Sequence, residues 1–270
     1  MQDRTQRHDL SGSDGVGASD ETTGTARFAF VIPVYNHGGT VRTVVTKAMG
    51  LGYPVVVVND GSSDSTEAEL GSITGIQVLN HRENLGKGAA LLTGFKAAAE
   101  VADYAITLDA DGQHEPGEAT MLVRAIRRDE RVLVLGCRQG MEDVSIPWTS
   151  RFGRRFSNFW VWVSGGPKVS DSQSGYRIYP VPETLELEPR RRRFDFEVEI
   201  LVLAKRQNLP VRQVPIGVSY TPEGERISHF RPFVDFWRNS VTFTRLIVER
   251  ILLFLTGPVR RSTKESRVEE

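Results

Sequence analysis

Residues 54–64 read PVVVVNDGSSD, a run of four valines followed by a turn that contains Gly, Ser and Asp. A continuous β-branched run is typical of a parallel strand that is covered on both faces. The turn favours a helix N-terminus, because Gly allows tight backbone geometry and Ser and Asp supply capping oxygens. The segment therefore predicts a strand, a loop and a helix at the centre of an α/β fold.

The same alternation extends on both sides of this unit. We expect strands over 28–35, 54–59, 76–80, 104–108 and 132–136, and helices over 40–49, 64–70, 88–101 and 118–128. This repetition predicts a Rossmann-like, mostly parallel sheet flanked by helices. The second half predicts helices over 150–163 and 195–206, a strand over 211–220, and one or two amphipathic helices over 233–255. Ligands of such sheets bind at loops after the carboxyl ends of strands, here 35–39, 60–64 and 109–114.

Composition narrows the class of protein. The 270 residues are 39% hydrophobic, and 34 Lys and Arg balance 34 Asp and Glu, so nucleic acid is not an expected partner. The single cysteine, Cys137, is typical of a reducing compartment, and we expect a cytoplasmic protein. No segment reaches the roughly 20 apolar residues of a membrane span. Residues 1–26 and 259–270 have few apolar side chains and predict disordered tails.

Two carboxylates follow the strand expected over 104–108, in the sequence Asp109-Ala110-Asp111-Gly112-Gln113-His114. Carboxylates two residues apart on a turning backbone can converge on Mg²⁺ or Mn²⁺, which leaves coordination positions for diphosphate oxygens. A solvated turn is the alternative interpretation of this acidic segment. For Asp60 too, two interpretations stay open: a ligand contact or a turn residue.

The segment Asn84–Gly88, NLGKG, precedes an Ala-rich helix. It lacks the Ser or Thr that follows Lys in a Walker loop, which excludes a P-loop nucleotide hydrolase. Lys87 at a helix start can approach a phosphate or the acidic loop. A tight strand-to-helix turn is the alternative interpretation.

Four of these motifs occur in the order seen in family 2 glycosyltransferases: IPVYN at 32–36, NDGSSD at 59–64, NLGKG at 84–88 and DADGQH at 109–114. Downstream, GCR at 136–138, DSQSGYR at 171–177, FDFEVE at 194–199 and VPI at 214–216 are similar to dolichyl- and polyprenyl-phosphate mannosyl- or glucosyltransferases. The resemblance covers roughly residues 27–235. His37 is a departure, because many relatives carry Glu there.

The resemblance implies a GT-A fold over 27–225, followed by an amphipathic helical region over 226–258. It implies a metal-dependent, inverting transfer of a hexose from a nucleotide sugar, of the GDP-mannose or UDP-glucose type, to a polyprenyl phosphate. The metal ligands would be Asp109, Asp111 and Gln113. The predicted nucleotide-sugar contacts are Pro33, Tyr35, Asn36, Asp60, Lys87 and Asp109. The predicted acceptor or phosphate contacts are Arg138, Arg151, Arg155, Arg177, Ser228, His229 and Arg231.

The acceptor decides which further catalytic group is needed. A phosphate is already anionic near neutral pH and needs no strong general base, whereas a sugar hydroxyl requires a positioned carboxylate. Asp171 is the candidate base in that case; an N-cap or an ion pair with Arg177 is its alternative role. Two other functions stay open: a family 2 transferase that acts on a saccharide hydroxyl or another lipid, and a non-catalytic nucleotide-binding protein of the same fold.

The expected C-terminal helix mixes apolar residues with Arg238, Arg245 and Arg250. A helix of this kind can rest in a lipid interface with its arginines near head groups. A helix that simply covers the core is the alternative. We therefore expect peripheral contact with the inner face of the cell membrane, where the lipid-phosphate acceptor would lie.

Overall fold

The computed structural model describes residues 26–139, 148–217 and 232–256. Its strands form one seven-stranded sheet in the order β3-β2-β1-β4-β6-β5-β7. The strands are β1 (Phe28–Val34), β2 (Val55–Asn59), β3 (Gln77–Asn80), β4 (Tyr104–Thr107), β5 (Leu133–Arg138), β6 (Arg177–Pro180) and β7 (Val211–Ile216). The valine strand β2 is buried along its whole length beside β1, as its sequence predicts. The expected tails fall outside these ranges except for Ala26.

The predicted mostly parallel sheet is confirmed, with one strand that the sequence pattern did not reveal. β1, β2, β3 and β4 pair in parallel, and so do β5 and β7. β6 lies between β4 and β5 and is antiparallel to both. It has only four residues, Arg-Ile-Tyr-Pro, which begin with a charge and end on a proline, so no alternation marks it as a strand.

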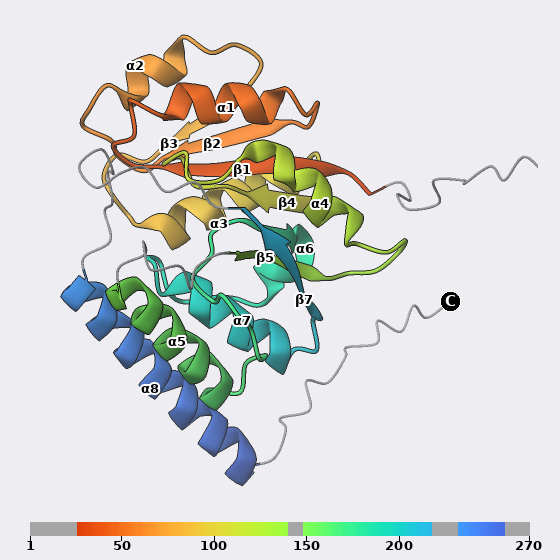
Figure 1. Ribbon diagram of the computed structural model, residues 1–270, viewed down its shortest axis with the longest axis vertical. Helices are drawn as coiled ribbons and strands as arrows, with labels where there is room; N and C mark the ends of the chain where they lie inside the picture. The colour runs from red at the N-terminus through yellow and green to blue at the C-terminus, as the bar shows by residue number, and fades with distance from the viewer. Residues whose placement is uncertain (1–25, 140–147, 218–231, 257–270) are drawn as a thin grey trace, which may run out of the picture.

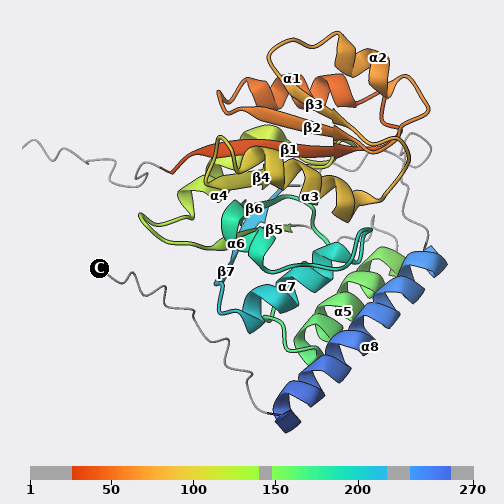
Figure 2. The same cartoon turned by 180° about the vertical axis from the view of Figure 1, so that it is seen from behind.

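Helices cover both faces of the sheet (Figure 1). They are α1 (Val41–Met49), α2 (Thr66–Gly71), α3 (Lys87–Ala98), α4 (Ala119–Arg124), α5 (Trp148–Val163), α6 (Val181–Glu186), α7 (Phe196–Arg206) and α8 (Pro232–Thr256), with a 3₁₀ turn (Pro116–Glu118) before α4. One hydrophobic core joins α1, α2 and α4 to the first face. A second core joins α3, α6 and α7 to the other face, where α5 and α8 form an outer pair (Figure 2). The short α6 was not predicted.

The C-terminal region predicted as amphipathic is a single helix, α8, and it packs on the same core as the sheet. Phe243 and Leu246 are buried among α7 and α5 side chains. Arg206 Nη1 lies 2.8 Å from Glu249 Oε2 and ties α7 to α8. The inner side of α8 therefore covers the core, which leaves its outer side to be explained. Within the described ranges, no helix is both long enough and apolar enough to cross a membrane.

Candidate active site

The loops expected at the carboxyl ends of β1, β2 and β4 lie against one another. Asn36 N donates to Ser62 Oγ at 2.9 Å, which joins the loop after β1 to the loop after β2. Thr40 Oγ1 donates to the carbonyl of Ala110 at 2.6 Å, which joins the first loop to the acidic loop after β4. The motifs of the predicted nucleotide-sugar site are thus neighbours in space.

The three residues predicted to bind the nucleotide sugar at the end of β1, Pro33, Tyr35 and Asn36, differ in their environments. Pro33 is buried within β1, so it supports the loop from inside the sheet and presents no surface to a ligand, which corrects its predicted role. Tyr35 and Asn36 are half-buried beyond the strand end. Asn36 has a left-handed backbone with φ of 52°, which asparagine tolerates better than most residues, and its Oδ1 accepts a hydrogen bond from Ser63 N at 2.7 Å.

Asp60 is turned into the protein. Its carboxylate accepts hydrogen bonds from Leu85 N at 3.0 Å and Gly86 N at 2.8 Å, and it lies 2.7 Å from His81 Nδ1. The side chain is almost completely buried. Next to it, Gly61 has φ of 70°, and a Cβ there would lie 2.5 Å from the backbone of Glu83. Asp60 therefore fastens the loop after β2 to the loop before α3, and its contact with a nucleotide remains a prediction.

Replacing Asp60 by alanine is expected to lower the free energy of unfolding by about 2–3 kcal/mol, because the buried donors of Leu85 and Gly86 lose their acceptor. Chemical denaturation measures this change. The matched control is Asp60→Asn, which keeps one acceptor oxygen and should lose less. A denaturation midpoint that is unchanged in Asp60→Ala would contradict the fastening role.

Asp109 and Asp111 follow β4 and differ in electrostatic setting. Burial alone would raise the pKa of the Asp109 carboxyl, but the Lys87 ammonium, 2.6 Å from Oδ1, holds that pKa below its ordinary value. Burial and the charge of Asp109 both raise the pKa of Asp111. Asp111 Oδ1 accepts a hydrogen bond from Gln113 N at 3.0 Å, and the Gln113 side chain is buried below the loop.

This donor set fits a hard divalent cation. In the described ranges, no group of three His, Cys, Asp or Glu side chains is placed to hold a metal. Two carboxylates and an amide instead form a partial set, which suits Mg²⁺ or Mn²⁺ because these ions keep water or diphosphate oxygens as further ligands. Burial, together with the neighbouring charge of Asp109, raises the pKa of Asp111, and a bound cation would offset both effects.

His114 is buried behind the acidic loop, with its ring centroid 5.5 Å from that of Tyr176. Burial lowers the pKa of its imidazole, and so does the charge of Arg138. A neutral imidazole is therefore expected near pH 7.

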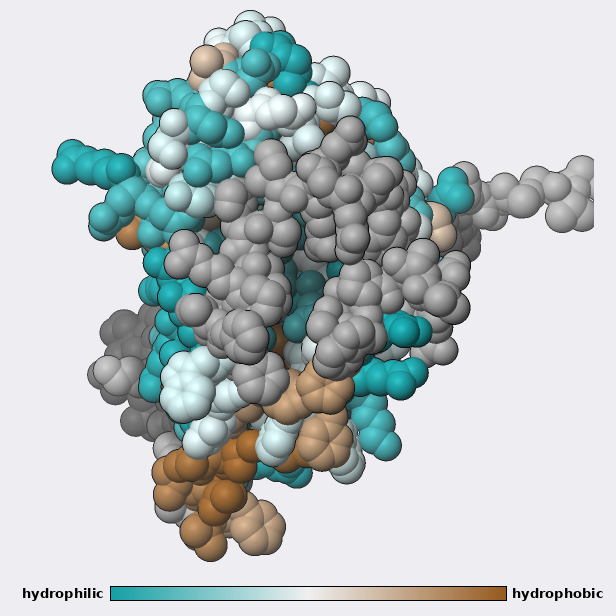
Figure 3. Space-filling model, turned by 60° about the vertical axis from the view of Figure 1, so that its left-hand side comes forward, coloured by the Kyte–Doolittle hydropathy of each residue, from teal (hydrophilic) through white to brown (hydrophobic). Residues whose placement is uncertain are grey.

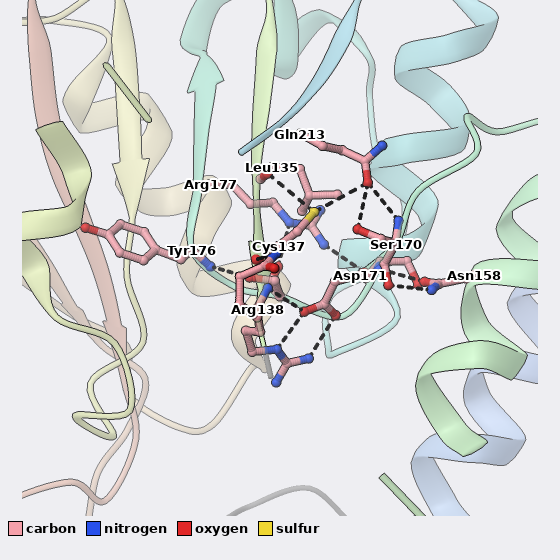
Figure 4. A network of polar contacts seen from close by, with 12 residues as sticks. Leu135, Cys137, Arg138, Asn158, Ser170, Asp171, Tyr176, Arg177 and Gln213 are labelled. Carbon is pink, nitrogen blue, oxygen red and sulfur yellow. Dashed lines mark hydrogen bonds and ion pairs between the residues drawn. The ribbon is translucent and has the colours of Figure 1, made fainter. Parts of the chain in front are cut away.

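Arg138 and Asp171 form a buried, two-pronged ion pair (Figure 4). Arg138 Nε donates to Asp171 Oδ2 at 2.7 Å and Nη2 donates to Oδ1 at 2.9 Å. Asp171 is fully buried; burial would raise its pKa, but the bonds from Arg138 hold that pKa below its ordinary value, with a further contribution from Arg154 on α5. Neither the expected N-cap nor the expected pairing with Arg177 is observed. A carboxylate with a lowered pKa is a weak base.

The predicted phosphate contact of Arg177 is wrong. Its guanidinium is fully buried and donates to the carbonyls of Ser174 at 2.7 Å, Ser172 at 2.8 Å and Glu197 at 2.9 Å. It therefore joins the 172–174 turn to the first turn of α7. With these donors already bonded inside the protein, it presents none to a ligand.

The remaining predicted acceptor contacts lie on α5 or outside the described residues. Arg151 is half-buried and Arg155 is exposed, one turn apart on α5. Ser228, His229 and Arg231 lie outside the described ranges. Of the basic residues of α5, Arg154 is close enough to Asp171, the partner of Arg138, to lower its pKa.

One carboxylate that lies beside the predicted site residues was not singled out in the sequence. Glu197 Oε1, in the first turn of α7, accepts a hydrogen bond from Lys87 Nζ at 2.6 Å, so Lys87 lies between Glu197 and Asp109. Acidic residues alternate with apolar ones in FDFEVEIL at 194–201. This pattern buries carboxylates at the start of a helix and could have indicated that Glu197 pairs with a basic side chain.

Comparisons with known proteins place this site in a family. Glycosyl transferase family 2 matches residues 29–181. The UDP-N-acetylglucosamine–dolichyl-phosphate N-acetylglucosaminyltransferase of Methanococcus voltae is 31% identical over 213 residues, 71% of this chain and 85% of that protein. The dolichyl-phosphate beta-glucosyltransferase of Saccharomyces cerevisiae is 25% identical over 219 residues, 69% of this chain and 65% of that protein.

Solved structures agree on the fold. A glucosyl-3-phosphoglycerate synthase from Mycobacterium tuberculosis, crystallised with Mn²⁺, uridine diphosphate and phosphoglyceric acid, superposes with a TM-score of 0.59 at 20% identity, covering 84% of this chain and 78% of that one. The chain belongs to glycosyltransferase family 2 and is a glycosyltransferase. The predicted family, fold class and likeness to dolichyl-phosphate transferases are confirmed, and the non-catalytic alternative is not supported.

Proposed function

We propose that the protein transfers a hexose from a nucleotide sugar to a polyprenyl phosphate, with inversion and with a divalent cation held by Asp109, Asp111 and Gln113. The relatives named above act on dolichyl phosphate, which supports this acceptor class. The observation that carries the proposal is the buried Arg138–Asp171 pair. It leaves Asp171 poorly suited to remove a proton from a hydroxyl, whereas a phosphate acceptor needs no such step.

The chemistry is a single displacement at the anomeric carbon. An anionic oxygen of the acceptor phosphate forms the new bond, the bond to the donor's β-phosphate breaks, and the nucleoside diphosphate leaves with the electron pair. No proton has to move. Asp109 and Asp111 would hold a divalent cation, which would supply positive charge to neutralise the leaving diphosphate. Arg138, fixed by Asp171, would orient the acceptor phosphate from the opposite side, because a guanidinium binds phosphate through parallel hydrogen bonds.

A transfer assay tests this proposal. Radiolabelled UDP- and GDP-hexoses are crossed with a polyprenyl phosphate, the matching polyprenol and a short saccharide. We expect product only with the phosphate, and its loss in excess chelator with recovery on adding Mn²⁺. Equal transfer to the polyprenol or the saccharide would favour the hydroxyl-acceptor alternative and overturn the proposal.

We also propose that the protein meets its lipid acceptor through an apolar stripe on α5 and α8. The stripe consists of Phe152, Phe159 and Trp162 on α5 and Trp237, Val241, Val248, Ile251, Leu252, Phe254 and Leu255 on α8, all exposed. On α5 they are seven and three residues apart, and Trp237, Val241 and Val248 are four and seven apart, which places each set on one side of its helix. Over 251–255 every residue, Leu253 included, is exposed, so the end of α8 is apolar on all sides. Figure 3 shows apolar side chains gathered at the end of the molecule where α8 finishes.

Two of the three arginines of α8 that were expected near lipid head groups make bonds within the protein. Arg245 is paired with the buried Glu199, and Arg250 Nη1 donates to the carbonyl of Val163 at 2.5 Å. Both therefore fix α8 to the protein. Hydrophobic area, more than charge, would drive contact with lipid.

Replacing Phe254 and Leu255, which are 88% and 72% exposed, by glutamate is expected to abolish flotation of the full chain with vesicles of neutral and anionic lipid. The control is Met121→Glu, which places one such charge at an exposed apolar position on α4, over the other face of the sheet. Flotation that persists in the double variant, or is equally lost in the control, would contradict the lipid contact.

A further inference from the structure

Lys87 is held by two carboxylates inside the protein. Its Nζ lies 2.6 Å from Asp109 Oδ1 and 2.6 Å from Glu197 Oε1, with side-chain exposures of 13%, 27% and 6% for Lys87, Asp109 and Glu197. Burial would lower the pKa of Lys87, but the two carboxylates raise it above its ordinary value, so the side chain is an ammonium. An ammonium has three hydrogens, and these contacts use two.

The position of Lys87 in its own helix is unfavourable for a cation. Lys87 is the first residue of α3, and the positive end of a helix dipole disfavours a positive side chain there. The backbone donors at this helix start, Leu85 N and Gly86 N, are already bonded to Asp60. The ammonium is therefore the positive group that α3 offers to the site, and its placement is better explained by a ligand than by helix stability.

The surroundings keep Lys87 in place. A Cβ at Gly175 would collide with Asp109 Oδ2 and lie 2.6 Å from Lys87 Nζ, so the 174–177 turn closes one side of the pair. The Phe194 ring lies 5.9 Å from Nζ. Glu197 is fixed in turn by Arg177, which donates to its carbonyl at 2.9 Å. Glu197 is thus the rigid partner, and Asp109 is the partner that faces the acidic loop.

The net charge of the cluster formed by Lys87 and its neighbouring carboxylates indicates how it would respond to a cation. Asp109, Asp111 and Glu197 carry three negative charges when ionised, and Lys87 carries one positive charge, so the cluster has the net charge that one divalent cation balances. A cation at Asp109 repels the neighbouring ammonium and weakens its hold on Asp109. Lys87 then keeps Glu197 as its anchor and has donors for a diphosphate oxygen.

We propose that Glu197 is a positioning residue that acts through Lys87: it holds the ammonium beside Asp109, where the ammonium restrains metal binding to the nucleotide-free protein and then binds the donor's diphosphate once the cation is present. This inference rests on the proposed function and adds to it an order of events at the donor site. It also explains why a glutamate is enclosed at the start of α7.

Two variants of the full chain should change two affinities in opposite directions. Mn²⁺ binding without nucleotide is measured by electron paramagnetic resonance, and UDP and GDP binding at saturating Mn²⁺ by calorimetry. Glu197→Gln should tighten Mn²⁺ binding about twofold and weaken nucleotide binding about fivefold, because the ammonium is no longer held beside Asp109, whereas loss of the negative charge alone would change both affinities in the reverse sense. Lys87→Met should tighten Mn²⁺ binding about fivefold and weaken nucleotide binding at least tenfold, because a competing cation and a phosphate donor are lost.

Two further variants control for folding. Lys87→Met leaves Glu197 without its cation, so the double variant Lys87→Met/Glu197→Gln removes both charges, and in it the Glu197→Gln effect on nucleotide binding should largely vanish. Glu199→Gln removes another buried carboxylate of α7, one paired with Arg245 instead, and should lower the melting temperature without changing either affinity.

The results distinguish failure of the positioning role from failure of the proposed function. Tighter Mn²⁺ binding together with weaker nucleotide binding in both single variants supports the positioning role. In Glu197→Gln, the reverse pair of changes, a parallel fall in both affinities, or no change in either overturns it and leaves the proposed function standing, provided that the parent binds Mn²⁺ and nucleotide. A parent that binds neither overturns the proposed function itself, and the positioning role with it.

Discussion

Replacing Asp111 by asparagine is expected to lower the transfer rate about a thousandfold while leaving the melting temperature equal to that of the parent or slightly higher. The rate falls because an amide is a poor ligand for the cation that balances the leaving diphosphate. Stability does not fall because burial and the charge of Asp109 raise the pKa of Asp111, which means that its ionised form is disfavoured in the folded protein. Transfer assays and thermal denaturation of the same preparation measure both effects.

The matched control is Asp103→Asn, at the opposite end of β4. Asp103 is paired with Arg27 near the surface, far along the strand from the acidic loop. We expect the transfer rate of Asp103→Asn to equal that of the parent. Retention of more than about a tenth of the parent rate in Asp111→Asn would show that the carboxylate does not hold an essential cation.

Much of the fold could be predicted because strong local patterns coincide with buried elements. The valine run of β2 is buried at every position, and the strands on either side of it are bounded by turn residues. β6 and α6 could not be predicted, because each is short and their shared stretch contains two prolines and three charged residues. Such elements form because they pair or pack with neighbouring elements in the folded protein. In this case β4 and β5 pair with β6 on either side.

The position of the site could be predicted from the sequence, but the roles of its residues could be predicted only in part. Loops at the carboxyl ends of parallel strands converge by topology, so Asp60, Lys87 and Asp109 could be grouped from sequence. The direction of each side chain could not. Asp60 and Arg177 point into the protein because backbone groups of distant segments accept or donate there, and a linear sequence does not show which segments those are.

The contrast between Asp171 and Glu197 shows how the acceptor and donor sides are organised. Each is a buried carboxylate that fixes a basic side chain: Asp171 holds Arg138 and Glu197 holds Lys87. Arg177 bonds to the turn that carries Asp171 and to the carbonyl of Glu197, so one buried guanidinium connects both supports. The geometry therefore fixes two basic side chains, Arg138 and Lys87, which is the arrangement that the proposed transfer between a diphosphate and a phosphate would use.

Replacing Arg138 by methionine is expected to lower the free energy of unfolding by about 3–5 kcal/mol and to remove measurable transfer to a polyprenyl phosphate. The loss of stability comes from Asp171, which would stay buried without its countercharge. The lowered pKa of Asp171 in the parent fixes the pH dependence: the pair stabilises the fold above the unfolded-state pKa of about 4, and that stability is lost as pH falls through the lower folded-state pKa. Denaturation at several pH values should show the variant losing this acid-side dependence.

The double variant Arg138→Met/Asp171→Asn separates stability from function. Without a buried charge it should regain most of the lost stability, because removing both members of a buried pair costs far less than removing one. Transfer should not return, since the guanidinium that orients the acceptor phosphate is still absent, while nucleotide binding at the donor side should match that of the parent. Recovery of transfer together with stability would mean that Arg138 supports only the fold and that the acceptor phosphate is held by other residues.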